Sequence, residues 1–118
     1  KAILAHQEPS TIDHYVERCA FDALTPHTIT SPTRLRTELE EIRQTGCAFD
    51  RQERELGIQC VAAPVFSREG SVLGAVSVSE SAVEGGAERL QDYAQMTIEV
   101  ARDVGRKIAT SGLDAVFS

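Results

Sequence analysis

The feature that most constrains the fold is a pair of apolar segments separated by a short polar link. Residues 58–66 (Ile-Gln-Cys-Val-Ala-Ala-Pro-Val-Phe) and residues 71–79 (Ser-Val-Leu-Gly-Ala-Val-Ser-Val-Ser) are rich in β-branched or small apolar side chains. The link between them, Ser-Arg-Glu-Gly, ends in glycine, which is typical of a tight turn between antiparallel strands. The pattern therefore predicts a β-hairpin.

The register of this hairpin decides which side chains lie together. If the four link residues form the loop, Phe66 faces Ser71 and Cys60 falls opposite Ser77. Because side chains alternate between the two faces of a sheet, Cys60, Ser77 and Ser79 then share one face. The alternative is that these small polar residues only fill a tight sheet and bond to the backbone. A register slip of one residue would separate them.

Helical signals precede the hairpin. Ser10 is the expected N-cap of a first helix, with Asp13 at its third position. Ser31, followed by proline, is the expected N-cap of a second helix, which runs to about residue 45 and ends at Gly46. The apolar residues at helical spacing are Ile12, Tyr15, Val16 and Cys19 in the first helix, and Leu35, Leu39 and Ile42 in the second.

Residues 47–50 read as a short strand, and a long helix is expected over residues 87–110, after a break at Glu84-Gly85-Gly86. The predicted buried stripe of this helix is Leu90, Tyr93, Ala94, Thr97, Val100, Ala101, Val104 and Ile108. Gly112 ends the helix, and the apolar residues of the tail, 113–118, either dock or fray. Since the hairpin strands are apolar on both faces, helices are expected on both sides of the sheet.

Composition bounds the class of protein. The chain of 118 residues suits one domain, its net charge is −6, and it lacks a cluster of Lys and Arg, so binding to nucleic acid by this piece itself is not expected. No apolar run is long enough to span a membrane and no signal peptide opens the sequence, which favours a cytoplasmic location. The first residues read as the inside of a helix, so an N-terminal part is expected to be missing.

The sequence contains no clear catalytic or metal-binding motif. Cys60 has no histidine at a recognisable companion spacing, although a cysteine-dependent enzyme using Cys60 stays open as an alternative. The three histidines and three cysteines lack metal-ligand spacing, and no glycine-rich phosphate loop is present, so neither a metal nor a cofactor is expected.

A binding site remains the favoured interpretation. Ser77 and Ser79 offer hydroxyl donors, and Asp50 lies near the mouth of the predicted sheet, where it accepts from a ligand hydroxyl. The acidic group of Asp50, Glu53 and Glu55 is equally consistent with a solvated loop. An anionic ligand facing an ionised Asp50 would be repelled, so either Asp50 lies off to the side or the acid end is held by backbone amides and the hydroxyls.

Several stretches carry a family resemblance. They are residues 1–5 (Lys-Ala-Ile-Leu-Ala), 24–30 (Leu-Thr-Pro-His-Thr-Ile-Thr), 35–50 (ending Gly-Cys-Ala-Phe-Asp), 53–66 (with Cys-Val-Ala-Ala-Pro-Val) and 74–79 (Gly-Ala-Val-Ser-Val-Ser). In order and spacing they resemble the effector-binding domain of IclR-type bacterial transcription regulators. The resemblance covers nearly the whole chain, so residues 1–118 are interpreted as one effector-binding domain that lacks its N-terminal part.

The resemblance implies an α/β domain with a GAF-like, profilin-like antiparallel sheet and helices packed on it. It implies a small organic acid or aromatic effector bound over the sheet by Asp50, Cys60, Ser77 and Ser79, with Cys47 in place of a larger aromatic residue. It also implies a homo-oligomer, a dimer or tetramer, that binds DNA only through an upstream helix-turn-helix domain. The alternatives are a GAF-type sensor of another signalling protein and a purely structural oligomerisation domain.

Overall fold

The computed structural model describes residues 1–82 and 86–112. Glu84 and Gly85 of the predicted break, and the tail over residues 113–118, lie outside the described residues. The elements in chain order are η1 (Leu4–His6), α1 (Pro9–Arg18), α2 (Pro32–Thr45), β1 (Ala48–Arg51), β2 (Ile58–Phe66), β3 (Val72–Ser81) and α3 (Gly86–Ser111). None of these helices is long and apolar enough to span a membrane.

The three strands form one antiparallel sheet in the order β1-β2-β3. The predicted hairpin is therefore confirmed, but its predicted register is wrong by two residues. Cys60 pairs with Ser79, and Ser77 pairs with Ala62. The shift arises because Phe66 pairs with Val72, which makes the connection five residues long, and an irregularity follows between positions 65 and 66. A shift of two residues keeps every side chain on its predicted face.

The helix that precedes the sheet, α2, begins and ends where the sequence predicts. The Ser31 side chain accepts a hydrogen bond from the Arg34 N–H, and Gly46 closes the helix with a left-handed φ of 85°. The first helix differs, because Pro9 starts α1 with Glu8 as the N-cap, so the predicted cap at Ser10 is wrong. Proline suits the first helical position because it lacks an N–H that would otherwise be unpaired there.

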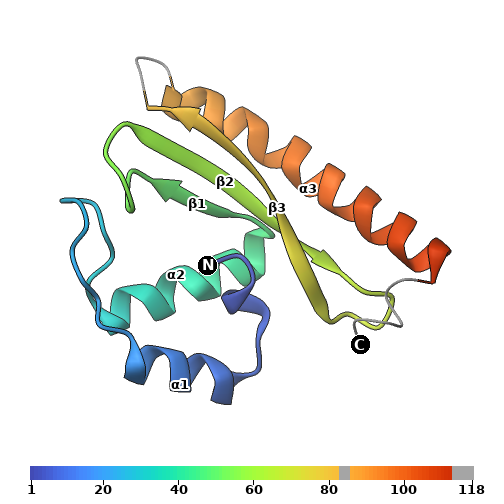
Figure 1. Cartoon of the computed structure of the whole chain (residues 1–118), viewed down its shortest axis with the longest axis horizontal. Coiled ribbons are helices and arrows are strands. Elements are labelled where there is room, and N and C mark those ends of the chain that lie inside the picture. Colours follow the sequence, from blue (N-terminus) through green and yellow to red (C-terminus); the bar gives the residue numbers. More distant parts are fainter. Residues whose placement is uncertain (83–85, 113–118) are drawn as a thin grey trace.

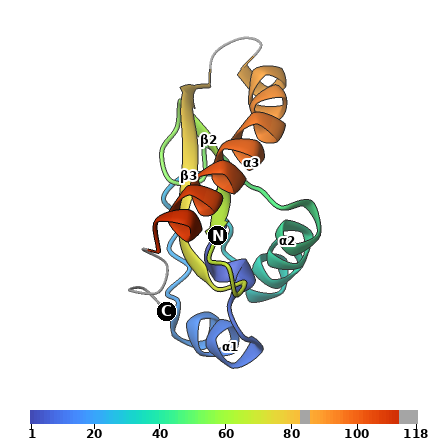
Figure 2. The same ribbon diagram turned by 90° about the vertical axis from the view of Figure 1, so that its right-hand side faces the viewer.

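The two faces of the sheet are covered unequally. In Figure 1, α3 runs along β2 and β3, whereas α1 and α2 lie on the opposite side of the sheet; in Figure 2, viewed from the α3 side, this helix crosses in front of β2 and β3. Val61, Ala63 and Val65 of β2 are buried against α3. On the other face, Ala48 and Ala62 pack against a cluster built from η1, α1 and α2.

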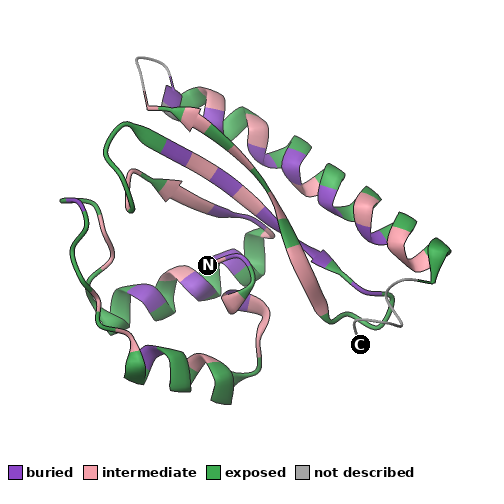
Figure 3. Cartoon of the chain, viewed as in Figure 1, coloured by how far each residue is buried: buried purple, intermediate pink, exposed green. Residues whose placement is uncertain are grey.

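The expectation of helices on both faces holds for β1 and β2 only. Along β3, residues of intermediate burial alternate with the exposed residues Ala75, Ser77 and Ser79, as the stripes in Figure 3 show. Because these side chains are small or polar, they provide little apolar surface for a helix to bury. This part of the sheet is therefore open on the side opposite α3.

The apolar stripe of α3 follows the predicted 3-and-4 spacing with one error. Leu90, Ala94, Thr97 and Ala101 are buried, but Val100 is 43% exposed. Ile98, which the prediction left out, contacts the core instead. A similar error occurs at Tyr15 of α1, which is exposed. Both mistakes come from assigning too wide an arc of the helix to its buried side.

Candidate functional site

The sheet brings three of the four predicted residues into one row. Asp50 of β1 pairs with Cys60 of β2, and Cys60 pairs with Ser79 of β3. In the next row Ala62 pairs with Ser77. Because Ala62 lies on the face opposite α3, the alternation of strand side chains places Asp50, Cys60, Ser77 and Ser79 on that same face.

A cavity of about 390 Å³ opens over this face. Asp50 and Cys60 line it, together with Ala48 and Ala62 from the floor of the sheet. The remaining lining residues are Lys1, Ala2, Leu24, Thr28, Phe49, Glu53 and Arg54. Ser77 and Ser79 do not line the cavity but lie exposed on the neighbouring strand β3. A volume of this size suits a small organic molecule.

Asp50 is fixed by the turn that follows it. Its Oδ1 accepts a hydrogen bond of 2.8 Å from the Glu53 N–H. The turn is closed further by Gln52, whose Oε1 accepts from the Gly57 N–H at 3.0 Å. Both Gln52 and Gly57 have a positive φ, a conformation that only glycine adopts without steric cost. One carboxylate oxygen of Asp50 thus holds the turn in place.

A cation lies at the inner wall of the cavity. The Nζ of Lys1 is 2.5 Å from Glu38 Oε2 and 2.7 Å from Glu53 Oε2, and it donates to the Phe49 carbonyl at 2.6 Å. Lys1 therefore joins α2 to the turn after β1. Its charge is already compensated by two carboxylates.

The segment before α2 is tied to the same turn. The Thr25 hydroxyl donates to the Gln52 carbonyl at 2.6 Å, and the Thr28 hydroxyl donates to the Glu53 carbonyl. Thr28 also accepts from the Leu24 N–H at 3.1 Å. These bonds hold Leu24, which is 66% exposed, at the rim of the cavity.

The surroundings of Cys60 disfavour its thiolate form. Burial, and then the negative charge of Asp50, raise the pKa of Cys60 above its ordinary value. A nucleophilic cysteine requires the opposite shift, toward a thiolate at neutral pH. Cys60 therefore lines the cavity as a thiol. Within residues 1–82 and 86–112, no group of three or more His, Cys, Asp or Glu side chains is arranged to hold a metal ion.

Sequence reasoning missed Arg54, Leu24 and Thr28 as residues of the cavity. Arg54 is exposed in the charged connection after β1, and Leu24 and Thr28 come from a loop without periodicity. No alternation pattern marks such positions, because tertiary contacts alone bring them to the sheet. The only signal was the density of hydroxyl residues in the loop over residues 25–30.

Comparison with known proteins identifies the family of the chain. The sequence model described as "Bacterial transcriptional regulator IclR C-terminal" matches residues 1–106. The chain belongs to the IclR family. The predicted fold class is confirmed with it, because the chain forms an antiparallel sheet with helices packed on it, and solved structures of transcriptional regulators, the IclR of Thermotoga maritima among them, share this fold over 92% of the chain.

Individual relatives support the assignment. The HTH-type transcriptional regulator KdgR of Escherichia coli is 32% identical over 108 residues, which are 92% of this chain and 41% of KdgR. The IclR of Thermotoga maritima has a TM-score of 0.83 with 35% identity, over 92% of this chain and 44% of that structure. This IclR domain thus spans about two fifths of the length of the curated regulators it matches.

A third structure shares the fold at lower identity. It is a double mutant of the inducer-binding domain of the transcription factor PobR from Acinetobacter, in complex with 3-hydroxybenzoic acid. Its TM-score is 0.75 with 20% identity, over 92% of this chain and 62% of the PobR chain.

Proposed function

We propose that this IclR-family domain binds a small organic acid or aromatic effector over the sheet, beside Asp50, Cys60, Ser77 and Ser79. The observation that carries the proposal is the cavity of about 390 Å³ on the face where these four residues gather. The complex of PobR with 3-hydroxybenzoic acid supports the same chemical class, because that domain shares the fold.

Each polar group has a defined part in this proposal. The Asp50 oxygen not used by the turn accepts from a ligand hydroxyl, while the exposed hydroxyls of Ser77 and Ser79 donate from β3. Cys60 supplies the wall between them. A few polar groups around an apolar floor are sufficient to orient a small molecule.

The acid end of an effector requires a cation, because Asp50 itself repels it. Arg54 lines the cavity and is exposed, and no carboxylate pairs with it within the part of the chain that the structure describes. Lys1 is a weaker candidate, since Glu38 and Glu53 already neutralise it. We therefore assign the ligand carboxylate to Arg54, which binds such groups in a bidentate manner.

Regulation follows from differential affinity. Residues 1–118 act as one effector-binding domain, and operator binding belongs to a DNA-binding domain outside this chain. If the effector binds one arrangement of a homo-oligomer more tightly than another, it shifts the spacing of the DNA-binding domains. A coupling of roughly 1–3 kcal/mol corresponds to about a 5- to 150-fold change in operator affinity. The domain performs this role without catalysis, and the raised pKa of Cys60 supports that assignment.

The proposal is tested by a thermal-shift screen of small organic acids and aromatics. A ligand that binds the native state raises the melting temperature. Asp50→Asn is the informative variant, because the asparagine oxygen still accepts from the Glu53 N–H while the charge is lost. We expect Asp50→Asn to weaken a hit by about tenfold, the effect of one hydrogen bond to a charged group, and Ser77→Ala to weaken it by a smaller but measurable factor, because its hydroxyl is exposed.

The matched control is Ser10→Ala, which removes a hydroxyl from the exposed surface of α1. This variant should bind the hit as the unmodified protein does. If a hit persists undiminished in both Asp50→Asn and Ser77→Ala, the effector does not bind at this face.

A further inference from the structure

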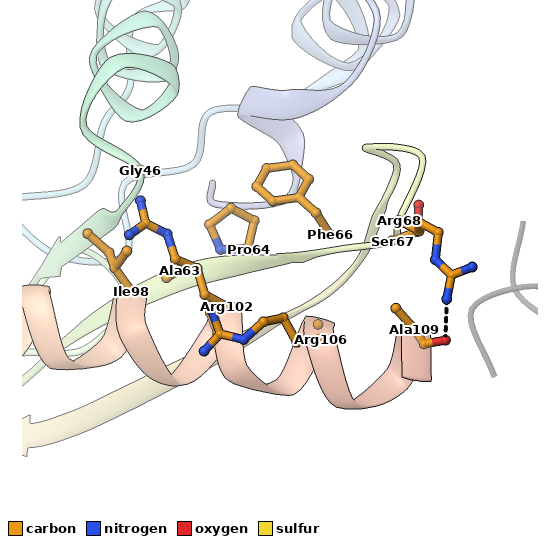
Figure 4. Close-up of a pocket in the computed structure, with 12 residues that line it drawn as sticks. Gly46, Ala63, Pro64, Phe66, Ser67, Arg68, Ile98, Arg102, Arg106 and Ala109 are labelled. Atoms are coloured by element: carbon orange, nitrogen blue, oxygen red, sulfur yellow. Dashed lines mark hydrogen bonds between the residues drawn. The ribbon is translucent and has the colours of Figure 1, made fainter. Parts of the chain in front are cut away.

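A second cavity lies between α3 and the end of β2, and its charged rim is formed by arginine. It has a volume of about 420 Å³, and Figure 4 shows the residues that line it. Ala63, Ile98 and Ala101 give it an apolar floor, and Arg68, Arg102 and Arg106 stand around that floor. We call this cavity the arginine groove. It shares no lining residue with the cavity beside Asp50.

The shape of the groove follows from the sheet and from one glycine. β1 pairs only with residues 59–62 of β2, so the part of β2 beyond Ala62 lies next to the groove without a neighbouring strand on that side. Gly105 lets α3 approach this part closely, because a Cβ there would lie 2.9 Å from the Phe66 carbonyl oxygen. The helix and the strand therefore form two fixed walls.

The charged side chains that line the groove within the described part of the chain are all arginines. The cavity beside Asp50 carries Lys1 and Arg54 against Asp50 and Glu53. Among the described residues, the lining of the arginine groove includes three arginines and no acidic side chain, although the whole chain has a net charge of −6. Apolar walls around like charges concentrate the field within the groove and favour an anion there.

The guanidinium groups differ in how far they are already engaged. Arg68 donates to the Ala109 carbonyl at 2.8 Å, and Arg106 is 3.4 Å from Asp103. For Arg102, no acidic partner lies within residues 1–82 and 86–112, and in Figure 4 its side chain extends from α3 toward Gly46 across the groove. Arg102 is therefore the group with the most binding capacity for an anion.

We propose that the arginine groove is a second binding site, which takes a small organic carboxylate with a compact apolar body. The apolar body lies on Ala63, Ile98 and Ala101, and the carboxylate pairs with Arg102, with Arg106 as the neighbouring cation. Arginine suits this role because its planar fork matches the two oxygens of a carboxylate. The volume of the groove fits a ligand of this kind. The proposal does not depend on the effector site beside Asp50.

The test is an NMR titration of the ¹⁵N-labelled 118-residue protein with benzoate, and with benzamide as its uncharged analogue. Benzoate should shift the amide signals of Ile98, Ala101 and Gly105 in a saturable manner. It should bind about tenfold tighter than benzamide, because the charged hydrogen bonds to arginine are lost with the amide. Arg102→Gln should weaken benzoate by a similar factor.

Lys107→Gln is the matched control, since it removes a positive charge from an exposed position of α3 outside the groove. Its affinity for benzoate should change by less than about twofold, as expected for a screened surface charge. Equal affinity for benzoate and benzamide, equal losses in Arg102→Gln and Lys107→Gln, or the absence of a saturable shift would overturn the proposal. So would shifts confined to residues 48–50 and 60–62, which would instead report the site beside Asp50. The dispersion of each spectrum shows whether a variant is folded.

Discussion

At the scale of the residue, the surroundings of Cys60 favour a binding site over a catalytic one. It lies in the middle of the row that joins Asp50 to Ser79, with neighbours on both adjacent strands. Burial and the carboxylate of Asp50 both disfavour its thiolate. The surroundings of Cys60 therefore favour the thiol over the thiolate that a nucleophilic cysteine needs.

Alkylation of Cys60 tests this directly. Because its pKa is raised, we expect iodoacetamide to modify Cys60 in the folded protein more slowly than in the urea-unfolded protein at pH 7.5, and the rate to increase with pH. Peptide mass spectrometry distinguishes Cys60 from Cys19 and Cys47. Faster modification of Cys60 in the folded state than in the unfolded state would instead support the alternative of a cysteine-dependent enzyme.

The four site residues show what a sequence pattern can supply. Alternation alone placed Cys60, Ser77 and Ser79 on one face, and that conclusion survived because the register error was an even number of residues. Arg54 could not be found in this way. It lies in an irregular connection, and only the turn fixed by Asp50 brings it to the cavity.

At the scale of the element, helix ends and close approaches carry the information. Ser31 caps α2 with its side chain, whereas Ser10 lies inside α1, which Pro9 begins. The sequence contains a plausible cap at both positions, and proline decides between them. Pattern reasoning gave the locations of α1, α2 and α3 correctly and misjudged which residue starts α1. The first residues, expected to be the inside of a helix, form only the short 3-10 helix η1.

The two serines form a matched pair for stability measurements. Ser31→Ala should lower the free energy of unfolding by about 0.5–1 kcal/mol, because the N–H of Arg34 loses its acceptor. Ser10→Ala should change it by less than about 0.5 kcal/mol, as is usual for an exposed site. Urea titrations of both variants measure the difference. Equal losses would mean that the Ser31 cap is not formed in solution.

The close approach of α3 to β2 gives a second prediction. A Cβ at Gly105 would lie 2.9 Å from the Phe66 carbonyl oxygen, whereas a Cβ at Gly74 would meet no atom within 4 Å. In Gly105→Ala, the clash should lower the free energy of unfolding by about 1–3 kcal/mol. Because alanine is a better helix former than glycine by roughly 1 kcal/mol, the net loss of stability should be smaller by that amount. Gly74→Ala is the control and should leave the urea midpoint nearly unchanged. A stabilised Gly105→Ala variant would contradict the packing described between these elements.

At the scale of the whole molecule, the sheet separates two different environments. One face is covered by α3 along its length, and the other is covered by η1 and α2 only over β1 and β2. His6 of η1 lies where this second layer meets the hairpin, with its ring 5.0 Å from the ring of Phe66. Protonation of His6 should therefore affect the packing between these layers, and with it the stability of the protein.

The pH dependence of stability follows from His6. Burial, and then the charge of Arg43, lower the pKa of His6 below its ordinary value of 6.5. The unfolded chain then binds the proton more readily than the folded one, so stability should fall as the pH drops below about 6.5. His6→Gln should make this decline shallower in urea titrations between pH 7.5 and 5. His14→Gln, on the exposed surface of α1, should leave the decline unchanged, and an equal slope in all three proteins would exclude a contribution from His6.

In the proposed complex, the effector occupies the cavity against Cys60, on the face of the sheet opposite α3. Calorimetric titration of a thermal-shift hit into Cys60→Ser and Cys60→Met tests it most directly, since serine keeps the volume of the side chain and methionine fills part of the cavity. We predict that Cys60→Ser binds within about threefold of the unmodified protein, while Cys60→Met binds about tenfold more weakly or not at all. Unchanged affinity in the folded Cys60→Met variant would show that the effector does not occupy this cavity.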